Sequence, residues 1–327
     1  MRAIRHEDKP EERVSSPVRQ EGRSIHVLVS SMSAGGRSVA VGPNVVRALI
    51  AIGRARAVPE FGHLPYVMGQ GNRKLSKRDP QSNLLIHRYR GMIPEGLLNY
   101  LALLGWSLSK DRDVFSREEM VEAFDIHDVG PNPARFDPVK CEAINAEHVR
   151  ALEATDFRDR LVPHLADALP DPEGRTAPAP LVSATSFDAL TEREQEILTA
   201  AAPLIQTRIQ LLRECRDMLG FLFVDDADLV VDDAALGKLG DSAPAVLDAA
   251  ISALEGLDGA GWTTARLEES LRAAIVEGLG IKPRLAFGPL RVAVTGRRVS
   301  PPLFESMEIL GADSTLARLR SLRARLG

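Results

Sequence analysis

Amphipathic helical segments recur through the second half of the chain and constrain its fold more than any other feature. From Asp156 onward, apolar residues return at the three- and four-residue spacing of one helix face. The predicted helices span residues 161–169, 191–202, 203–223, 243–257, 263–278 and 314–326. One stretch of this half, 290–294 between Pro289 and Gly296, has the composition of extended chain. The pattern therefore predicts a mainly α fold.

The preceding residues predict short helices around a little extended chain. A helix begins at Pro94 and is ended by Gly105. The residues predicted to share its buried face are Leu97, Leu98, Leu101 and Leu104. Ser116 and Glu119 have the spacing of a capping box ahead of another helix. The other predicted elements are a strand at 64–68 and helices at 46–53, 82–89, 137–145 and 146–153.

Composition divides the chain into three parts. Residues 1–45 mix charges with Pro10 and Pro17 and contain few apolar side chains, so we expect a disordered segment there. Residues 46–155 combine short helices with a basic loop, and residues 156–327 form the helical region. Within that region, the proline- and glycine-rich stretch 170–180 is the best candidate for an internal boundary.

The whole chain has the composition of an ordinary globular protein, with 44% apolar and 26% charged residues. Its net charge is −4, so a nucleic-acid partner would have to be bound by local basic patches. Cys141 and Cys215 lie in no Cys/His cluster, so we expect neither a metal site with zinc nor a disulfide framework. The charged N-terminus and the lack of a membrane-length apolar run predict a cytoplasmic protein with no membrane partner. We expect a monomer, although these features do not bear on oligomeric state.

The basic loop, residues 69–78, carries four positive charges within its last six residues. Gly69 and Gly71 allow backbone N–H groups to turn inward, and Lys74 and Lys77 supply mobile charges for phosphate oxygens. The loop could therefore hold a polyphosphate while its charge redistributes during transfer. By itself, a loop of this kind is more often a solvated basic turn, and the residues that follow it change that balance.

Several motifs around this loop occur in the order found in one enzyme family. They are Phe61-Gly62-His63-Leu64-Pro65, Lys74-Leu75-Ser76-Lys77-Arg78-Asp79, Ile93-Pro94-Glu95-Gly96-Leu97, Ala134-Arg135-Phe136-Asp137 with Asn145, Lys282-Pro283-Arg284, Arg291-Val292-Ala293 and Ser300-Pro301-Pro302-Leu303. From about Arg47 to its C-terminus, the chain resembles the C-terminal portion of bacterial glutamyl-tRNA synthetases. The second motif resembles that family's form of the class I "KMSKS" signature. The resemblance implies the end of a catalytic and stem-contact region, followed by an α-helical anticodon-binding domain.

The resemblance also implies a reaction, glutamate–tRNA ligation. ATP, as a substrate with Mg²⁺, would activate L-glutamate as an adenylate, and the glutamyl group would then pass to a glutamate-accepting tRNA. Lys77 would bind ATP and stabilise the charge of the departing pyrophosphate, while Lys74 and Ser76 would assist as catalytic residues. Gly69 and Gly71 would serve as hinges of the ATP-binding loop.

One departure from the family limits this expectation. The sequence contains no His-x-Gly-His motif and no strand–glycine-turn–helix near its start that could bind adenine and ribose. We therefore expect a truncated active site and negligible aminoacylation by the chain alone. The alternatives are a non-catalytic tRNA-binding module and the product of a truncated or frameshifted gene.

Basic residues outside the loop are candidate tRNA contacts. In the stem-contact region they are Arg135 and Lys140, and in the helical half they are Arg208, Arg213, Arg284 and Arg291. Basic side chains of this kind position a nucleic-acid backbone without reading its sequence. Each has a structural alternative: Arg135 could pair with Asp137, Arg208 and Arg213 could lie on a solvated helix face, and Arg284 and Arg291 could pack the last helices.

Overall fold

The computed structural model describes residues 18–20, 23–25, 64–69, 71, 73–176, 178–257 and 259–327. The prediction of a mainly α fold is confirmed. The expected helix at 46–53 and the family motif at 61–63 lie outside the described residues, as does most of the segment 1–45. Within that segment, β1 (Val18–Gln20) pairs antiparallel with β2 (Arg23–Ile25).

A first group of helices follows the basic loop. It consists of η2 (Pro80–Ser82), α2 (Leu84–Arg90), α3 (Pro94–Ala102), α4 (Arg117–Ala123), η3 (Ile126–Asp128) and α5 (Pro138–Ala151). Two short strands, β3 (Val67–Met68) and β4 (Ala134–Arg135), pair in parallel beside these helices. The predicted capping box is present, because Ser116 and Glu119 exchange side-chain and backbone hydrogen bonds at the start of α4.

Two predictions for this group were wrong. The helices expected at 137–145 and 146–153 form the single helix α5, which Asp137 caps and which contains no glycine or internal proline to break it. On α3, Leu98 and Leu101 are 38% and 47% exposed. The buried face instead carries Gly96, Leu97, Asn99 and Tyr100. The polar Asn99 replaces leucine there because its amide hydrogen-bonds to neighbouring backbone.

The second group consists of α6 (Ala154–Leu165), η4 (Phe187–Ala189), α7 (Glu192–Ile205), η5 (Leu212–Glu214), α8 (Cys215–Leu219) and η6 (Gly220–Leu222). The predicted helix 203–223 was wrong, because α7 continues through Pro203 and ends at Ile205. The stretch 170–180 is a loop, as expected, but it separates no cores. Leu181 N–H donates to Leu165 O (2.9 Å), and α6 packs against α7.

The third group completes the chain. It consists of η7 (Asp226–Asp228), α9 (Asp233–Leu236), α10 (Ala243–Glu255), η8 (Gly259–Gly261), α11 (Thr264–Leu271), η9 (a π-helix, Arg272–Glu277), α12 (Pro283–Ala286), α13 (Gly288–Thr295), α14 (Leu303–Leu310) and α15 (Ala312–Arg325). The extended stretch expected at 290–294 is the helix α13. Leu290 and Val292 to Val294 are all at most 1% exposed, so burial of this helix extends beyond the single apolar face of an amphipathic helix.

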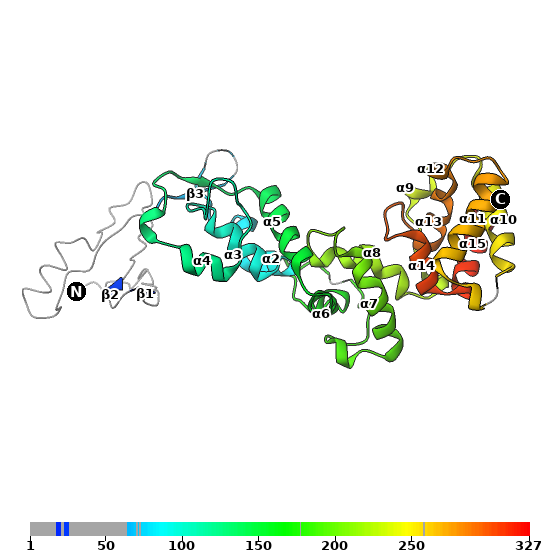
Figure 1. The fold of residues 1–327 in the computed structure, drawn as a ribbon, viewed down its shortest axis with the longest axis horizontal. Coiled ribbons are helices and arrows are strands. Elements are labelled where there is room, and N and C mark those ends of the chain that lie inside the picture. Colours follow the sequence, from blue (N-terminus) through cyan, green and yellow to red (C-terminus); the bar gives the residue numbers. More distant parts are fainter. Residues whose placement is uncertain are drawn as a thin grey trace, which may run out of the picture.

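The three groups follow one another along the long axis of the molecule, with α2–α5 towards one end, α6–α8 in the middle and α10–α15 at the other end (Figure 1). Their apolar cores interlock. The main core spans the second and third groups and includes Ile93 and Val149 from the first. The smaller core of the first group includes Leu211, which lies after α7. The first two groups therefore share their interior.

Asn145 of α5 connects the first group to the second. Its side chain is 0% exposed; Oδ1 accepts the Ile93 N–H (2.9 Å), and Nδ2 donates to Gln210 O (2.6 Å). Ile93 is the N-cap residue of α3, and Gln210 lies in the segment between α7 and η5. One buried amide therefore fixes three parts of the chain relative to one another.

The segment 206–212 supplies the other contacts of this junction. Gln206 Nε2 donates to Leu152 O (2.9 Å), and Leu212 N–H donates to Gly91 O (2.9 Å). Gly91 has φ +89°, and a Cβ there would lie 2.4 Å from Arg213 N, so the close approach requires glycine. The chain leaves the helical path after Ile205 because these contacts with the first group replace helical hydrogen bonds.

Replacing Asn145 with alanine tests this junction. The change leaves the Ile93 N–H and the Gln210 C=O unpaired in a buried site, at about 1–3 kcal/mol each. We therefore expect the free energy of unfolding, measured by urea denaturation, to fall by about 2–6 kcal/mol. Asn83→Ala is the matched control, because Asn83 caps α2 through one bond from Leu85 N–H, and losing such a cap costs about 1 kcal/mol. A loss for Asn145→Ala no larger than the control's would contradict this role.

Candidate functional site

The basic loop is a narrow hairpin. Gly69 N–H donates to Arg73 O (2.9 Å), Leu75 N–H donates to Val67 O (2.9 Å), and Lys74 forms an antiparallel bridge with Met68. Gly71 lies at its tip with φ +70°, a conformation that favours glycine. Gly69 does not have a positive φ; it is buried, and a Cβ there would lie 3.3 Å from a methyl carbon of Leu75. Of the two glycines predicted as hinges, Gly71 thus favours glycine because of its backbone conformation, and Gly69 because of its close packing.

Asp79 holds the second half of the loop in a tight turn. Its Oδ2 accepts the Ser76 N–H (2.6 Å), and its Oδ1 lies 3.3 Å from Arg73 Nη2. The hydroxyl of Ser82 in η2 donates to Ser76 O (2.8 Å) and joins the turn to the helices. The sequence reasoning missed this role of Asp79, although a serine followed three residues later by an acidic residue has the spacing of a capping box.

The predicted catalytic residues lie together in this frame. Lys77 follows the Asp79-capped Ser76 and is exposed, and no described carboxylate forms an ion pair with it. Ser76 Oγ accepts the Arg78 N–H (3.2 Å), which directs the hydroxyl towards the turn. Lys74 lies on the hairpin, with its Nζ 4.0 Å from the centroid of the Tyr66 ring. The loop therefore presents exposed cations on a backbone that its own hydrogen bonds fix.

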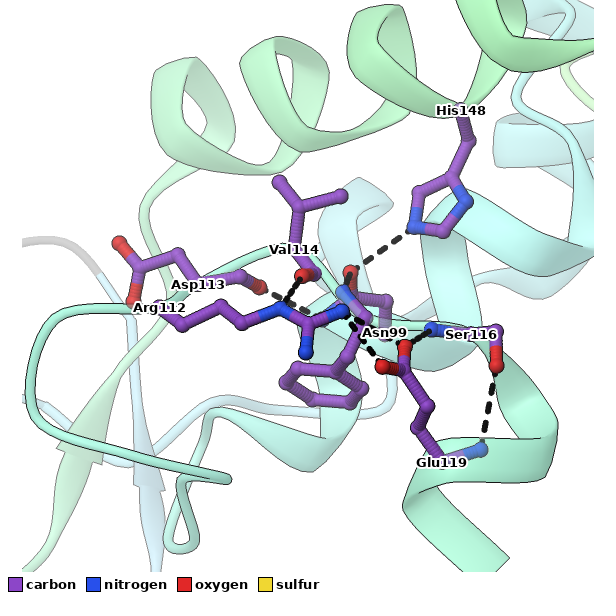
Figure 2. A network of polar contacts seen from close by, with 8 residues as sticks. Asn99, Arg112, Asp113, Val114, Ser116, Glu119 and His148 are labelled. Atoms are coloured by element: carbon purple, nitrogen blue, oxygen red, sulfur yellow. Dashed lines mark hydrogen bonds and ion pairs between the residues drawn. The ribbon is translucent and has the colours of Figure 1, made fainter.

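A polar network around Asn99 lies in the first group of helices (Figure 2). Asn99 Nδ2 donates to Asp113 O (2.9 Å), and its Oδ1 accepts from Phe115 N–H (3.1 Å) and His148 Nε2 (2.8 Å). Lys140 Nζ pairs with the carboxylate of Asp113 (2.8 Å). The network thus joins α3 and α5 to the loop before α4. Sequence reasoning missed Asn99, which an apolar-face pattern cannot reveal.

The candidates of this region therefore differ in their surroundings. Lys140, at 46% exposure, already has a carboxylate partner, so a tRNA phosphate would have to compete for it. Arg135 is exposed on β4. The carboxylate of Asp137, the expected alternative partner of Arg135, accepts the N–H groups of Val139 (2.9 Å) and Lys140 (3.2 Å) and caps α5.

In the helical half, the charge of Arg208 acts on Arg291, which hydrogen bonds hold in place. Burial of Arg291 and, next in size, the like charge of Arg208 lower the pKa of the Arg291 guanidinium. Arg291 Nη1 donates to Ser300 Oγ and to Pro301 O (2.7 Å), so its orientation is fixed. Arg208 is exposed in the turn after α7. The side chain of Arg284, the third candidate here, lies outside the described residues.

Arg213 and the arginines of α15 have structural partners. Arg213 Nη2 lies 2.6 Å from Asp167 Oδ1, and its guanidinium lies 3.9 Å from the centroid of the Tyr89 ring, which favours a role in the junction over tRNA contact. Arg318 is 3% exposed and pairs with Asp226 (2.6 Å). The partners of Arg320 and Arg323 are Glu255 and Asp248.

No described helix combines the length and apolar character needed to cross a membrane. Nor do three or more His, Cys, Asp or Glu side chains gather into a possible metal site in the part of the chain that the structure describes.

Two family models match the chain. The model described as "Anticodon binding domain" matches residues 156–323, and the one described as "tRNA synthetases class I (E and Q), catalytic domain" matches residues 47–142. Glutamate–tRNA ligases of Kocuria rhizophila and Kineococcus radiotolerans are 61% and 60% identical to the chain over 280 and 281 residues. The chain belongs to the glutamate–tRNA ligase family. The resemblance inferred from the sequence motifs is thus confirmed.

The chain spans about half the length of the curated relatives it matches. The alignments cover 86% and 85% of this chain and 52% of each of the two relatives. A crystal structure of a glutamate tRNA ligase from Elizabethkingia meningosepticum in complex with its amino acid shares the fold, with a TM-score of 0.64 and 21% identity. That match covers 87% of this chain and 55% of the other.

His164 makes the stability of the protein depend on pH. Burial, and then the charges of Arg213, Arg216 and Arg88, lower the pKa of His164 to about 4. In the unfolded chain, His164 has an ordinary pKa near 6.5 and therefore binds a proton more readily than in the folded chain. Its contribution to the free energy of unfolding is thus complete above pH 6.5 and is lost as the pH falls towards 4. We expect the free energy of unfolding to fall by about 3 kcal/mol over this range.

Urea denaturation at a series of pH values measures this effect. His164→Gln should remove most of the slope between pH 6.5 and 4, whereas His127→Gln, at an exposed position, should leave it unchanged. Equal slopes in the wild type and His164→Gln would contradict the assignment.

Proposed function

We propose that residues 156–327 bind the anticodon arm of a glutamate-accepting tRNA, and that the basic loop binds the polyphosphate of ATP during glutamyl-adenylate formation. In this proposal, one domain boundary lies between residues 155 and 156, and the protein is cytoplasmic and monomeric. Ligation would require a polypeptide that supplies the rest of the relatives' length, because the catalytic-domain match covers only residues 47–142.

The proposed role in adenylate formation rests on one observation. The ammonium of Lys77 is exposed on a loop whose turn Asp79 stabilises. When the glutamate carboxylate attacks the α-phosphorus of ATP, negative charge grows on the departing pyrophosphate. A fixed cation beside those oxygens lowers the free energy of that transition state. Lys74 adds a second positive charge, and Mg²⁺ would arrive on ATP, held mainly by phosphate oxygens.

Arg291 and Arg208 support the tRNA-binding part. Arg291 remains oriented by Ser300 and Pro301, while Arg208 is exposed and its charge acts on Arg291. A tRNA phosphate that bound near both guanidinium groups would offset the repulsion between their like charges. The "Anticodon binding domain" match over residues 156–323 agrees with this position.

The alternative is a tRNA-binding module without catalysis. The longer match, to the anticodon-binding family, favours this alternative over ligation by the chain alone. The two functions differ in whether a complementing polypeptide can restore adenylate formation.

The catalytic part is tested by glutamate-dependent ATP–pyrophosphate exchange. We expect negligible exchange by the purified chain, because a clamp without positioned substrates lacks a proximity contribution of about 7–11 kcal/mol. Addition of the remaining portion of a relative as a separate polypeptide should restore exchange. Lys77→Gln should then lower the restored rate by about 10²–10³-fold. Lys110→Gln, a matched exposed lysine, should have no effect. A chain that binds tRNA but cannot be complemented would support the alternative module.

The tRNA-binding part is tested by titrating labelled tRNA at several salt concentrations. The wild-type chain should bind with a steep dependence on salt, and Arg208→Gln should weaken binding and reduce the slope by about 1. Arg320→Gln is the control, because Arg320 of α15 already pairs with Glu255 of α10 (2.6 Å). Failure of the wild type to bind at low salt, or an unchanged slope in Arg208→Gln, would overturn this part.

A further inference from the structure

Lys74 is held by an aromatic ring at the base of the hairpin. Its Nζ lies 4.0 Å from the centroid of the Tyr66 ring, within the range of a cation–π contact. The register explains why the two side chains meet. Lys74 is opposite Met68, and Tyr66 lies two residues before Met68, so Tyr66 is the diagonal neighbour of Lys74 on the same face. Long and aromatic side chains bridge this separation.

The ring holds this cation differently from the way a carboxylate would. Arg73, the preceding cation of the loop, pairs with Asp79 at 3.3 Å, and the negative charge offsets its own. The neutral ring of Tyr66 orients the Lys74 ammonium without cancelling its charge. An ammonium has three N–H donors, and a ring covers one side of it, so donors remain for an anion. Lys74 is therefore ordered but still able to bind phosphate oxygens.

We propose that Tyr66 is a positioning residue that holds the Lys74 ammonium where the basic loop receives a polyphosphate. The inference rests on the proposed function of that loop. A free lysine loses rotamer freedom when it binds an anion, and a contact that orders it beforehand reduces this loss. Tyr66 remains over Lys74 in the bound state and touches no phosphate itself.

The effect should be modest, because Tyr66 is 38% exposed. Cation–π contacts at exposed positions correspond to a change in affinity of about 2–5-fold. Tyr66→Leu should weaken binding of inorganic tripolyphosphate to the chain by this factor. Tyr66→Phe keeps the ring face and should bind as the wild type does. In a Lys74→Gln background, Tyr66→Leu should have no further effect, because the cation that it orients is gone.

The experiment combines titration with tripolyphosphate and NMR of lysine side chains in the 327-residue chain. The ε-methylene protons of Lys74 should show an upfield ring-current shift in the wild type and in Tyr66→Phe, and no such shift in Tyr66→Leu. The shift should persist when tripolyphosphate is bound. Phe124→Leu is the matched control, because Phe124 has the same 38% exposure and packs against Trp106, outside the loop. It should change neither the affinity nor the Lys74 signal.

Several results would overturn the inference. They are a wild-type Lys74 signal without a ring-current shift, an affinity of Tyr66→Leu equal to or higher than that of the wild type, and a shift that disappears on binding. If the wild type shows the ring-current shift but does not bind tripolyphosphate, the role of Tyr66 falls together with the proposed function. In that case, the intact contact between Tyr66 and Lys74 would show that the proposed binding of polyphosphate by the loop is wrong.

Discussion

The buried amide of Asn145 is the contact on which the arrangement of the other parts depends. It pairs with backbone groups of Ile93 and Gln210, which belong to segments far apart in sequence. The position of the segment 206–212, and hence of Arg208, follows from this contact and from the close approach at Gly91. The basic loop is joined to the helices of the first group separately, through the hydrogen bond from the Ser82 hydroxyl to Ser76 O. The first group therefore holds both candidate binding regions, each through its own contacts.

The partners of the cations distinguish structural from functional positions. Arg213 and Arg318 have structural partners. Arg213 pairs with Asp167 and lies over the Tyr89 ring, and Arg318 binds Asp226 and backbone carbonyl oxygens. Lys77 and Arg208 are exposed and form no ion pair with a carboxylate among the described residues. A desolvated cation that has its partners gains little from a phosphate, whereas an exposed one can release counterions on binding tRNA or ATP. Sequence position alone does not separate these classes.

The errors in the sequence predictions have particular physical causes. Residues 203–223 have a helical period, but contacts of Gln206 and Leu212 with the first group end the helix. Residues 290–294 are apolar except for Arg291 and suggest extended chain, yet burial of Leu290 and of Val292 to Val294 stabilises them as a helix. On α3, Asn99 is buried where leucine was expected, because its amide binds the chain before α4. In each case, long-range contacts outweighed local preference.

The sequence by itself determined the mainly α class, most helix starts, the capping box at Ser116, and the family, because these depend on local spacing and on motifs. It also located the basic loop with Lys74, Ser76 and Lys77. Only the tertiary structure decided which cations are free, since pairing partners such as Asp167 for Arg213 are 46 residues apart. The roles of Asp79, Asn99 and Asn145 likewise depend on hydrogen bonds to backbone groups that only folding brings within reach.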